Sequence, residues 1–493
     1  MKLPALLAAC LCLGAPLWAA ARPPPNIVVI LADDVGYGDL GCYGATKVKT
    51  PNLDRLAREG ARFTDAHAPA SVCTPTRYAL LTGRYAWRQP NTGIAPGDSP
   101  LLIKPGTVTL ASALQSAGYA TALVGKWHLG LGATTPDFNA DLKPGPLELG
   151  FDHAFYIPAT GDRVPCVFIE DHRVVGLDPA DPIAVSYAQR LGSEPTGAER
   201  PEWLKIKGDR NHSDSIVNGI SRIGFMTGGH RARWVDETIA DTLARRATAF
   251  IDRQSGAKPF FLLLTTHDIH EPMVPNPRFR GTSECGWRGD VIHQLDWTVG
   301  EVLAALERRG LARDTLVIFS SDNGGAIKDT YDDGTNALHA LQPPNGALRG
   351  EKGRLYEGGH RVPFIARWPA RIPAGRESGA LLGLVDLLPT FASLAGAKLP
   401  PGAAPDAVDL HATLLLEANA RGRDQLVLQN NRQAPLALRA GDWKLIETSS
   451  HPELYNLRAD PGETRDLAAT EPGRVQALAA LLAAERAKSL PPP

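Results

Sequence analysis

The stretch Asn26-Ile27-Val28-Val29-Ile30-Leu31-Ala32-Asp33-Asp34 joins a continuous apolar run to a pair of carboxylates. Such a run, rich in Val, Ile and Leu, is typical of a parallel strand that is covered on both faces. Similar runs that also end in polar residues occur at 119–125, 260–266 and 315–321. Helical patterns lie between them, at 50–57, 109–117, 235–254 and 290–309. This alternation predicts an α/β sheet with helices on both faces.

Ligands of such sheets bind beyond the carboxyl ends of the strands, so the polar residues that follow the four runs are expected to form one site. These residues are Asp33-Asp34, Lys126-Trp127-His128, His267-Asp268-Ile269-His270 and Asp322-Asn323. The first and last pairs offer carboxylate and amide oxygens, which favour a hard divalent cation over zinc or copper. The alternative for an Asp–Asp pair after a strand is a helix cap and a solvated charge.

The segment Ser71-Val72-Cys73-Thr74-Pro75-Thr76-Arg77 places a cysteine just before a predicted helix. Thr74 is predicted to be the N-cap, and Pro75 fits the first helical position, where its missing N–H costs nothing. Cys73 would then lie where free backbone N–H groups and the helix dipole favour anionic chemistry. Arg77, about one turn later, adds a cation to the same helix face. The alternative is a small apolar cysteine packed beneath a helix start.

Cys73-Thr74-Pro75-Thr76-Arg77, followed by Leu80-Leu81-Thr82-Gly83-Arg84, resembles the signature of the type I sulfatases of the alkaline phosphatase superfamily. Thr76 stands where that family usually has Ser. The resemblance implies an alkaline-phosphatase-like fold, with a doubly wound mixed sheet flanked by helices. It also implies that a maturation enzyme oxidises Cys73 to formylglycine (3-oxoalanine). The hydrated aldehyde, a gem-diol, would be the nucleophile that attacks sulfur.

The segment Gly125-Lys126-Trp127-His128-Leu129-Gly130 resembles a second motif of the same family. It implies that Lys126 contacts the sulfate and that His128 is the base that removes a proton from the second diol hydroxyl. Arg77 is counted among the catalytic residues through the first motif. A plain structural alternative puts Lys126 in solvent and His128 in the core.

Later matches to the family complete the implied site, and the resemblance as a whole covers roughly residues 26–488. His270 in His270-Glu271-Pro272 matches a His-x-Pro position, which implies a sulfate contact and a proton donor to the departing alcohol. His267 competes for that role. Lys352, within Leu348-Arg349-Gly350-Glu351-Lys352-Gly353, matches a second sulfate-binding lysine. Thr160 aligns weakly with a substrate-site hydroxyl that orients the base histidine, and a turn residue is the alternative.

The resemblance also implies one bound divalent cation, with calcium as the expected ion and magnesium as the alternative. Its ligands would be Asp33, Asp34, Asp322 and Asn323, together with the diol made from Cys73. The ion would orient the sulfate ester and offset its negative charge.

The composition and the N-terminal segment indicate the expected partners and compartment. Of the 493 residues, 43% are hydrophobic and 21% charged, and the net charge is −1, which gives no reason to expect nucleic acid or an acidic membrane as partner. Residues 1–21 have the three parts of a secretory signal, so we expect cleavage before Arg22 and export to the periplasm or extracellular space. No later stretch is apolar enough to be a transmembrane segment. Pairing among Cys42, Cys166 and Cys285 is left open.

We expect a sulfatase catalytic domain at 22–400 and a C-terminal α+β subdomain at 401–493, because 399–405 is rich in Pro, Gly and Ala. Short strand patterns at 425–428, 436–439 and 443–447 precede a helical pattern at 474–488. The subdomain is expected to carry a small antiparallel sheet and a helix.

The expected reaction is hydrolysis of an organic sulfate monoester to an alcohol and inorganic sulfate. A sulfated carbohydrate is the expected substrate, with aryl sulfates as surrogates. The alternatives are a formylglycine-dependent phosphonate monoester or phosphodiester hydrolase, and a sulfoglycan-binding protein without catalysis. The insert at 167–234 has polar and aromatic residues that could form a sugar or aryl subsite. They are Trp203, Lys205, Lys207, Arg210, Asn211 and His212. Linkage specificity and oligomeric state are left open.

Overall fold

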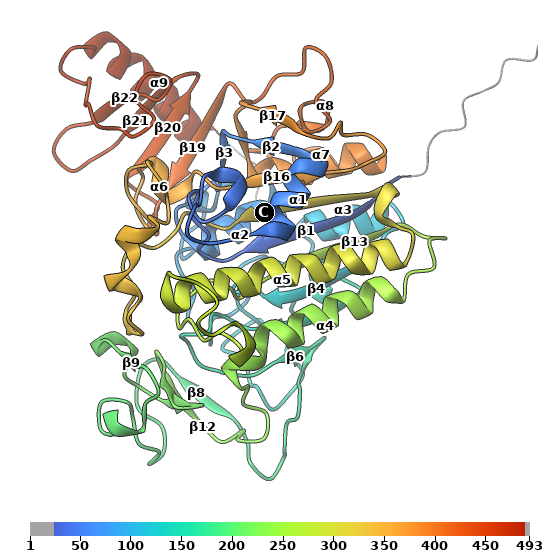
Figure 1. Ribbon diagram of the computed structural model, residues 1–493, viewed down its shortest axis with the longest axis vertical. Helices are drawn as coiled ribbons and strands as arrows, with labels where there is room; N and C mark the ends of the chain where they lie inside the picture. Colours follow the sequence, from blue (N-terminus) through green and yellow to red (C-terminus); the bar gives the residue numbers. More distant parts are fainter. Residues whose placement is uncertain (1–23, 489–493) are drawn as a thin grey trace, which may run out of the picture.

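The protein is described here by a computed structural model that covers residues 24–488, so the predicted signal at 1–21 lies outside the described residues. Its centre is a ten-stranded mixed sheet (Figure 1). In spatial order the strands are β17 (Arg376–Ser378), β2 (Ala61–Phe63), β16 (Phe364–Arg367), β14 (Thr315–Ser321), β1 (Asn26–Ala32), β13 (Phe260–Thr265), β4 (Ala120–Lys126), β5 (His153–Ile157), β6 (Ile169–Glu170) and β7 (Arg173–Val174). The predicted mixed α/β sheet is confirmed.

The middle of the sheet is parallel and fully buried. β1 pairs in parallel with β13 on one side and β14 on the other, and β13 pairs in parallel with β4. In β1, the residues from Ile27 to Ala32 are at most 1% exposed, as the apolar run predicts for a strand covered on both faces. The strand direction changes at β16, which runs antiparallel to β14.

Two groups of helices flank the sheet (Figure 1). One group, in which the helices pack on one another, is α1 (Pro51–Glu59), α4 (Ile239–Asp252) and α5 (Gly286–Arg308). The other is α2 (Cys73–Thr82), α3 (Leu110–Ser116) and α7 (Leu387–Ala395). α5 begins four residues before the predicted 290, and α4 begins four residues after the predicted 235 because a 3-10 turn occupies Asp236–Thr238.

The remaining elements are short or lie outside the central sheet. The helices are α6 (Glu357–His360) and α8 (His411–Leu414), and one two-stranded sheet joins β3 (Ala66–His67) to β18 (Leu382–Gly383). The insert forms two small two-stranded sheets of its own, β8 (Ala184–Ser186) with β12 (Phe225–Thr227) and β10 (Ile216–Val217) with β11 (Ile220–Ser221). Its strand β9 (Lys207–Gly208) pairs with β15 (Tyr331–Asp332), which lies outside the insert.

The C-terminal region carries the expected small antiparallel sheet and helix. The strands are β19 (Gln425–Gln429), β20 (Leu436–Ala440), β21 (Trp443–Ile446) and β22 (Glu453–Asn456), in that order, and α9 (Pro472–Ala487) packs on β20 and β21. The fourth strand was not expected. In Figure 1 this sheet and the insert lie at opposite ends of the molecule, with the central sheet between them. The boundary near residue 400 stays a prediction.

Two further features bear on the expected compartment. Within residues 24–488, the helices are all too short or too polar to cross a membrane. Cys42, Cys73, Cys166 and Cys285 are all free thiols in this part of the chain.

Candidate active site

The ends of the parallel strands bring the predicted polar clusters to one edge of the sheet. The register pairs Ala32 at the end of β1 with Ser321 at the end of β14, so Asp33 and Asp322 follow side by side. The backbone N–H of Asp322 donates to the Ala32 carbonyl at 3.0 Å, and that of Asp33 donates to the Asp268 carbonyl at 3.1 Å. The ladder therefore continues beyond the strands and fixes the spacing of the clusters.

The start of α2 differs from the prediction. The helix begins at Cys73 with Val72 as its N-cap, so the prediction that Thr74 caps it is wrong. The Thr74 hydroxyl instead donates to the His128 carbonyl and accepts from the Ala95 N–H, each at 3.2 Å, because these tertiary partners lie within its reach. Pro75 takes the third helical position, whose N–H also has no partner within a helix. Cys73 is 1% exposed at this buried helix start.

The four predicted oxygen-bearing residues form one buried cluster. Asp33, Asp34, Asp322 and Asn323 are at most 5% exposed, and the Asn323 side-chain N–H donates to Asp34 Oδ1 at 2.7 Å. Among the described residues, Asp33 Oδ1 and Asn323 Oδ1 are buried without a hydrogen-bond partner. Ligand atoms of Asp33, Asp34 and His270 lie within 4.8 Å of one another. Because buried oxygens need partners, this set fits a hard divalent cation.

Burial and like charge act together on these carboxylates. Burial raises the pKa of Asp33 and of Asp322, and the negative neighbours of each carboxylate raise it further. Burial acts on Asp34 in the same direction, but Lys352, His270 and Lys126 outweigh it and hold the pKa of Asp34 well below its usual range. A cluster of this kind needs compensating positive charge.

Three cations supply such charge from within the chain. Arg77 donates to Asp322 Oδ2 through Nε at 2.9 Å and Nη2 at 2.6 Å. Lys126 Nζ lies 2.6 Å from Asp33 Oδ2, and Lys352 Nζ lies 2.7 Å from Asp34 Oδ2. Arg77 and Lys126 are almost fully buried, whereas the Lys352 side chain is 18% exposed. Lys352 is therefore the cation that reaches the open side of the cluster.

His128 has the geometry of a proton acceptor. Its Nε2 lies 2.9 Å from the Ala95 carbonyl, which can only accept, so Nε2 carries the hydrogen. Its Nδ1 is buried and has no hydrogen-bond partner among residues 24–488. Burial, together with the nearby Lys126, lowers the pKa of His128 well below its usual range. The neutral ring thus keeps a free lone pair on Nδ1.

His270 lies at the cluster, and His267 lies behind it. The His270 Nδ1 is 2.6 Å from the Glu271 carbonyl, so Nδ1 is the donor and Nε2 is the atom that points to Asp34 Oδ2 at 3.9 Å. Burial and then Lys352 lower the pKa of His270 to about 4. The ring of His267 is instead packed against Gly161, where an added Cβ would come within 2.3 Å of it. This placement favours His270 over His267 as the group that meets a ligand.

A cavity of about 470 Å³ opens over these groups. Cys73, Asp34, His270 and Lys352 line it, and Asn211 and His212 reach it from the insert. The other four predicted insert residues are not in its wall. Sequence reasoning missed several wall residues, although Asp162 directly follows Gly161 and Glu271 directly follows His270 along the chain. The missed residues are Ile94, Asp162, Arg163, Ile223, Glu271, Ala326, Lys328, Asp329 and Glu351.

One side of the cavity is a polar wall of Asp162, Arg163, His212 and Glu271. His212 Nε2 lies 3.4 Å from Asp162 Oδ2 and 3.7 Å from Glu271 Oε1. Burial opposes a charge on His212, but Asp162, together with Asp209 and Glu271, outweighs it and raises the pKa of His212. Thr160 donates to Asp162 and accepts from Arg163, and no hydrogen bond between Thr160 and His128 is found in the described chain. The orienting role of Thr160 stays a prediction.

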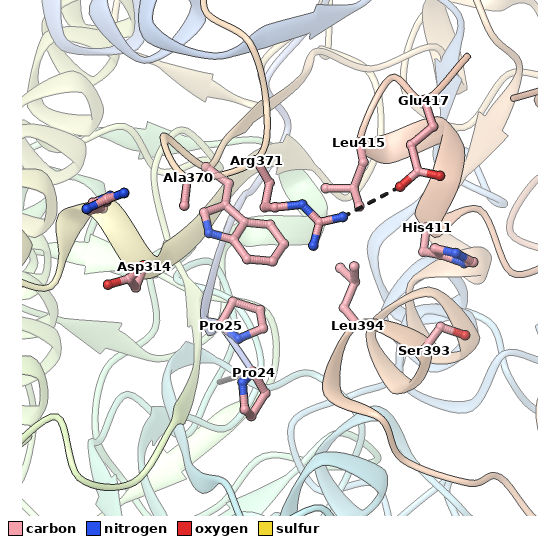
Figure 2. A pocket seen from close by; sticks show the side chains of 12 residues that line it. Pro24, Pro25, Asp314, Ala370, Arg371, Ser393, Leu394, His411, Leu415 and Glu417 are labelled. Atoms are coloured by element: carbon pink, nitrogen blue, oxygen red, sulfur yellow. Dashed lines mark ion pairs between the residues drawn. The ribbon is translucent and has the colours of Figure 1, made fainter. Parts of the chain in front are cut away.

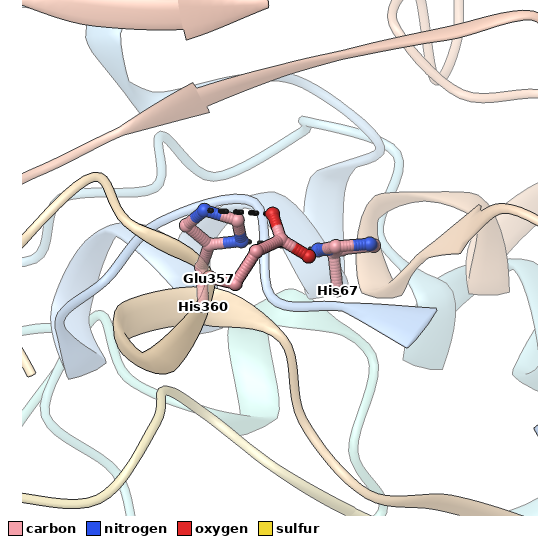
Figure 3. Close-up of side chains that lie close together, drawn as sticks. All are labelled: His67, Glu357 and His360. Atoms are coloured by element: carbon pink, nitrogen blue, oxygen red, sulfur yellow. Dashed lines mark hydrogen bonds and ion pairs between the residues drawn. The ribbon is translucent and has the colours of Figure 1, made fainter. Parts of the chain in front are cut away.

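A second group with metal-ligand chemistry lies away from this cavity. Figure 3 shows His67, Glu357 and His360 close together, and the two imidazoles are in contact, with His67 Nδ1 3.0 Å from His360 Nδ1. Lys444 Nζ from β21 lies 3.0 Å from Glu357 Oε1 and 2.9 Å from His360 Nε2, and it also pairs with Glu463 at 2.8 Å. An ammonium group thus already provides the positive charge that a metal would supply. We interpret this cluster as a structural link to the C-terminal sheet.

The cavity in Figure 2, of about 450 Å³, also lies apart from the candidate site. Pro24 and Pro25 precede β1, and Arg313 and Asp314 precede β14, so the cavity is at the opposite end of the parallel strands from Cys73. Arg371 and Glu417 form an ion pair of 3.5 Å across it.

A mixed α/β sheet that gathers oxygen ligands, cations and a helix start at its strand ends is the arrangement of the alkaline-phosphatase-like ester hydrolases. A family model described as Sulfatase matches residues 25–397. The chain is 48% identical over 475 residues to the N-acetylgalactosamine-6-O-sulfatase of Bacteroides thetaiotaomicron, which covers 93% of this chain and 92% of the relative. Human arylsulfatase A is 35% identical over 485 residues, covering 91% and 84% of the two chains.

The solved structures agree with these relatives. One, from work on the metabolism of multiple glycosaminoglycans by Bacteroides thetaiotaomicron, superposes with a TM-score of 0.92 at 47% identity and covers 95% of this chain and all of the other. The chain belongs to the sulfatase family, and it is a sulfuric ester hydrolase. The resemblance found in the motifs and the predicted reaction are thereby confirmed.

Proposed function

We propose that this sulfatase removes the sulfate from a sulfated carbohydrate, with formylglycine made from Cys73 as nucleophile and one calcium ion. The observation that carries the proposal is the position of Cys73, which lines the same cavity as Asp34, His270 and Lys352. The substrate class rests on a relative, 48% identical, that is named as acting on N-acetylgalactosamine carrying a 6-O-sulfate. Magnesium is the alternative ion.

The ion would be held by Asp33, Asp34, Asp322 and Asn323, where two buried oxygens have no partner in the described chain. When bound, it supplies a Lewis acid that polarises the sulfate oxygens and offsets their charge. The hydrated aldehyde at position 73 supplies two hydroxyl groups on one carbon. One would attack sulfur and displace the alcohol, and loss of the proton from the other would then expel sulfate and restore the aldehyde.

The remaining steps belong to side chains around the cavity. Lys126 and Lys352 bind the sulfate oxygens, whose charge is spread over several acceptors and needs several donors. His128 accepts the proton of the second hydroxyl on its free Nδ1. Arg77 holds Asp322 through two hydrogen bonds and so fixes the oxygen cluster beneath the helix start.

His270 must be charged when it serves as the acid. In the neutral form of the ring, Nδ1 carries the hydrogen and donates it to the Glu271 carbonyl, and Nε2 carries no hydrogen. The proton that it gives to the leaving alcohol must therefore sit on Nε2, where the negative charge of a bound sulfate ester stabilises it.

Export and maturation complete the proposal. We place the protein in the periplasm or outside the cell, after removal of residues 1–21, and its partner is an enzyme that oxidises Cys73. N-terminal sequencing of material from the native compartment should begin at Arg22. A start at Met1 would contradict export by this route.

The test of the function has two parts. Peptide mass spectrometry around position 73 should find the aldehyde or its hydrate, and the host must contain a compatible maturation enzyme. The modified protein should then release sulfate from a 6-O-sulfated amino sugar and from an aryl sulfate, with little turnover of an aryl phosphodiester. An unmodified thiol in active protein would overturn the nucleophile assignment, and dominant phosphodiester turnover would overturn the substrate assignment.

A further inference from the structure

A second, larger cavity adjoins the active site on the side of the C-terminal sheet. Its volume is about 970 Å³. We call it the C-terminal groove. It is lined by Gly353, Arg354, Leu355, Tyr356, Asn430, Gln433, Ala434, Pro435, Ile446, Glu447, Thr448, Ser449 and Arg486.

Only a thin wall separates the groove from the catalytic cavity. Lys352 lines the catalytic cavity, and the next residue, Gly353, lines the groove. Elsewhere in the wall, the N–H of Ile94, a catalytic-cavity residue, donates to Asn431 Oδ1 at 2.7 Å, and Asn431 directly follows the groove residue Asn430. A molecule longer than the catalytic cavity would reach the groove by crossing the rim that these residues form.

The chemistry of the groove suits a carbohydrate. Amide side chains from Asn430 and Gln433 and hydroxyls from Thr448 and Ser449 provide donors and acceptors for sugar hydroxyls. The ring of Tyr356 and the buried side chains of Leu355 and Ile446 provide an apolar surface beneath them. Mostly apolar walls with a few placed polar groups are typical of small-molecule sites.

Arg354 gives the groove a charge preference. Its side chain is exposed and forms no ion pair or hydrogen bond with any residue in 24–488, whereas Arg486 is paired with Glu447 at 2.5 and 2.6 Å. The groove therefore presents one uncompensated guanidinium, two residues from the sulfate-binding Lys352. Such a group favours a planar or tetrahedral anion with several oxygen acceptors.

We propose that the C-terminal groove binds the sugar units next to the ring that is desulfated, and that Arg354 pairs with a second anionic group on them. The substrate is then an anionic oligosaccharide rather than a sulfated monosaccharide. The anion is a sulfate or a carboxylate, which share this chemistry. The proposal rests on the proposed function, because it assumes a sulfated sugar in the catalytic cavity.

The kinetic test compares Arg354→Gln with wild type on a sulfated monosaccharide and on three matched oligosaccharides. These carry a second sulfate, a carboxylate or no second anion. Loss of one charge-assisted hydrogen bond should lower kcat/KM on an anionic oligosaccharide by about tenfold or more, mainly through KM. The monosaccharide and the neutral oligosaccharide should be unaffected. Arg354→Lys should retain part of the effect, and the anion that shows the larger loss identifies the group.

The control is Arg458→Gln, which removes one charge from the same region, at a side chain that is 83% exposed and outside the groove. It should leave all four substrates unchanged. Equal kcat/KM of Arg354→Gln and wild type on every substrate would overturn the proposal that the groove binds sugar. A higher kcat/KM of wild type on the monosaccharide than on the anionic oligosaccharides would overturn it as well.

A binding measurement separates this inference from the proposed function. Calorimetry with Cys73→Ala and an anionic oligosaccharide requires no turnover, and Arg354→Gln in that background should weaken binding by about tenfold. If modified wild type hydrolyses no sulfated sugar but binding still depends on Arg354, the reaction assignment fails and the groove stands. Binding that is independent of Arg354 overturns the groove.

Discussion

At the scale of single residues, the site depends on two side chains held in uncommon backbone conformations. Asp34 and His128 have φ values of 62° and 57°, in the left-handed region that residues other than glycine rarely adopt. The N–H of Trp127 and that of His128 donate at 3.0 Å to the carbonyls of Ile157 and Pro158, so the β4–β5 ladder continues until the chain turns at His128. The turn directs the imidazole to Ala95 and leaves Nδ1 free, which is how a strained residue serves function.

Replacing the cysteine tests the nucleophile. Cys73→Ala should lower turnover by about 10⁴-fold or more, because no other side chain can form the aldehyde. Circular dichroism should show a folded protein, since the substitution removes a single sulfur atom. Cys285→Ala, at another buried cysteine that precedes α5, should keep full activity. Normal turnover in Cys73→Ala would refute the assignment.

The polar wall should make stability depend on pH. The pKa of His212 is raised above 6.5 in the folded protein, because Asp162, together with Asp209 and Glu271, outweighs the effect of burial. The charged imidazole therefore stabilises the fold fully below pH 6.5, and this contribution is lost as pH rises through the folded-state pKa. The free energy of unfolding of wild type minus that of His212→Gln, from urea titrations, should be larger at pH 6 than at pH 9. A difference that is the same at both values would contradict this account.

At the scale of elements, the register of parallel strands explains why so much of the site could be predicted. Apolar runs locate β1 and β14, and pairing of Ala32 with Ser321 then places the aspartates together. Strands of two residues, such as β3 and β7, have too little pattern to detect. The N-cap at Thr74 was wrong because tertiary partners took its hydroxyl. Loop residues such as Asp162 were missed because no periodicity specifies where a loop folds back.

The link between β21 and α6 is another feature that the sequence does not reveal. Lys444 is fully buried and pairs with Glu357 and Glu463. Lys444 Nζ and the Leu355 carbonyl lie 2.9 and 3.1 Å from His360 Nε2, and His360 Nδ1 lies 3.0 Å from His67 Nδ1. His67 Nε2 in turn lies 2.8 Å from Asp65. This chain of hydrogen bonds fastens the C-terminal sheet to the catalytic region.

Breaking that link should destabilise the protein. Lys444→Met leaves the buried Glu463 without its cation and leaves Glu357 with Arg361 alone, which costs about 3–5 kcal/mol of the free energy of unfolding. Lys47→Met, which removes the same group from an exposed pair with Glu284, should change it by less than about 0.5 kcal/mol. Denaturant titrations of both variants provide the comparison. Similar small effects in the two would show that the buried network contributes little.

At the scale of the whole molecule, the central sheet carries the proposed reacting groups, and the insert and the C-terminal sheet lie beside them. The insert contributes Asn211 and His212 to one side of the catalytic cavity, and the C-terminal sheet builds the neighbouring groove on another. Figure 1 shows these two units on either side of the strand ends. Reaction chemistry and substrate selection thus come from different parts of the fold, so variants in the groove should change KM without changing the modification of Cys73.

Metal removal tests how the oxygen cluster contributes to the whole fold. Three buried carboxylates repel one another, so a cation that binds only the folded state should stabilise it, by about 2.7 kcal/mol at a free concentration a hundred times Kd. Treatment with EGTA should lower Tm and abolish turnover, and added calcium should restore both more effectively than magnesium. Asp322→Asn should lose the ion in elemental analysis, although it also disturbs Arg77, so chelation of wild type is the decisive measurement. If Tm and activity persist once the protein is shown to be free of divalent metal, the cluster is a network of internal ion pairs and not a metal site.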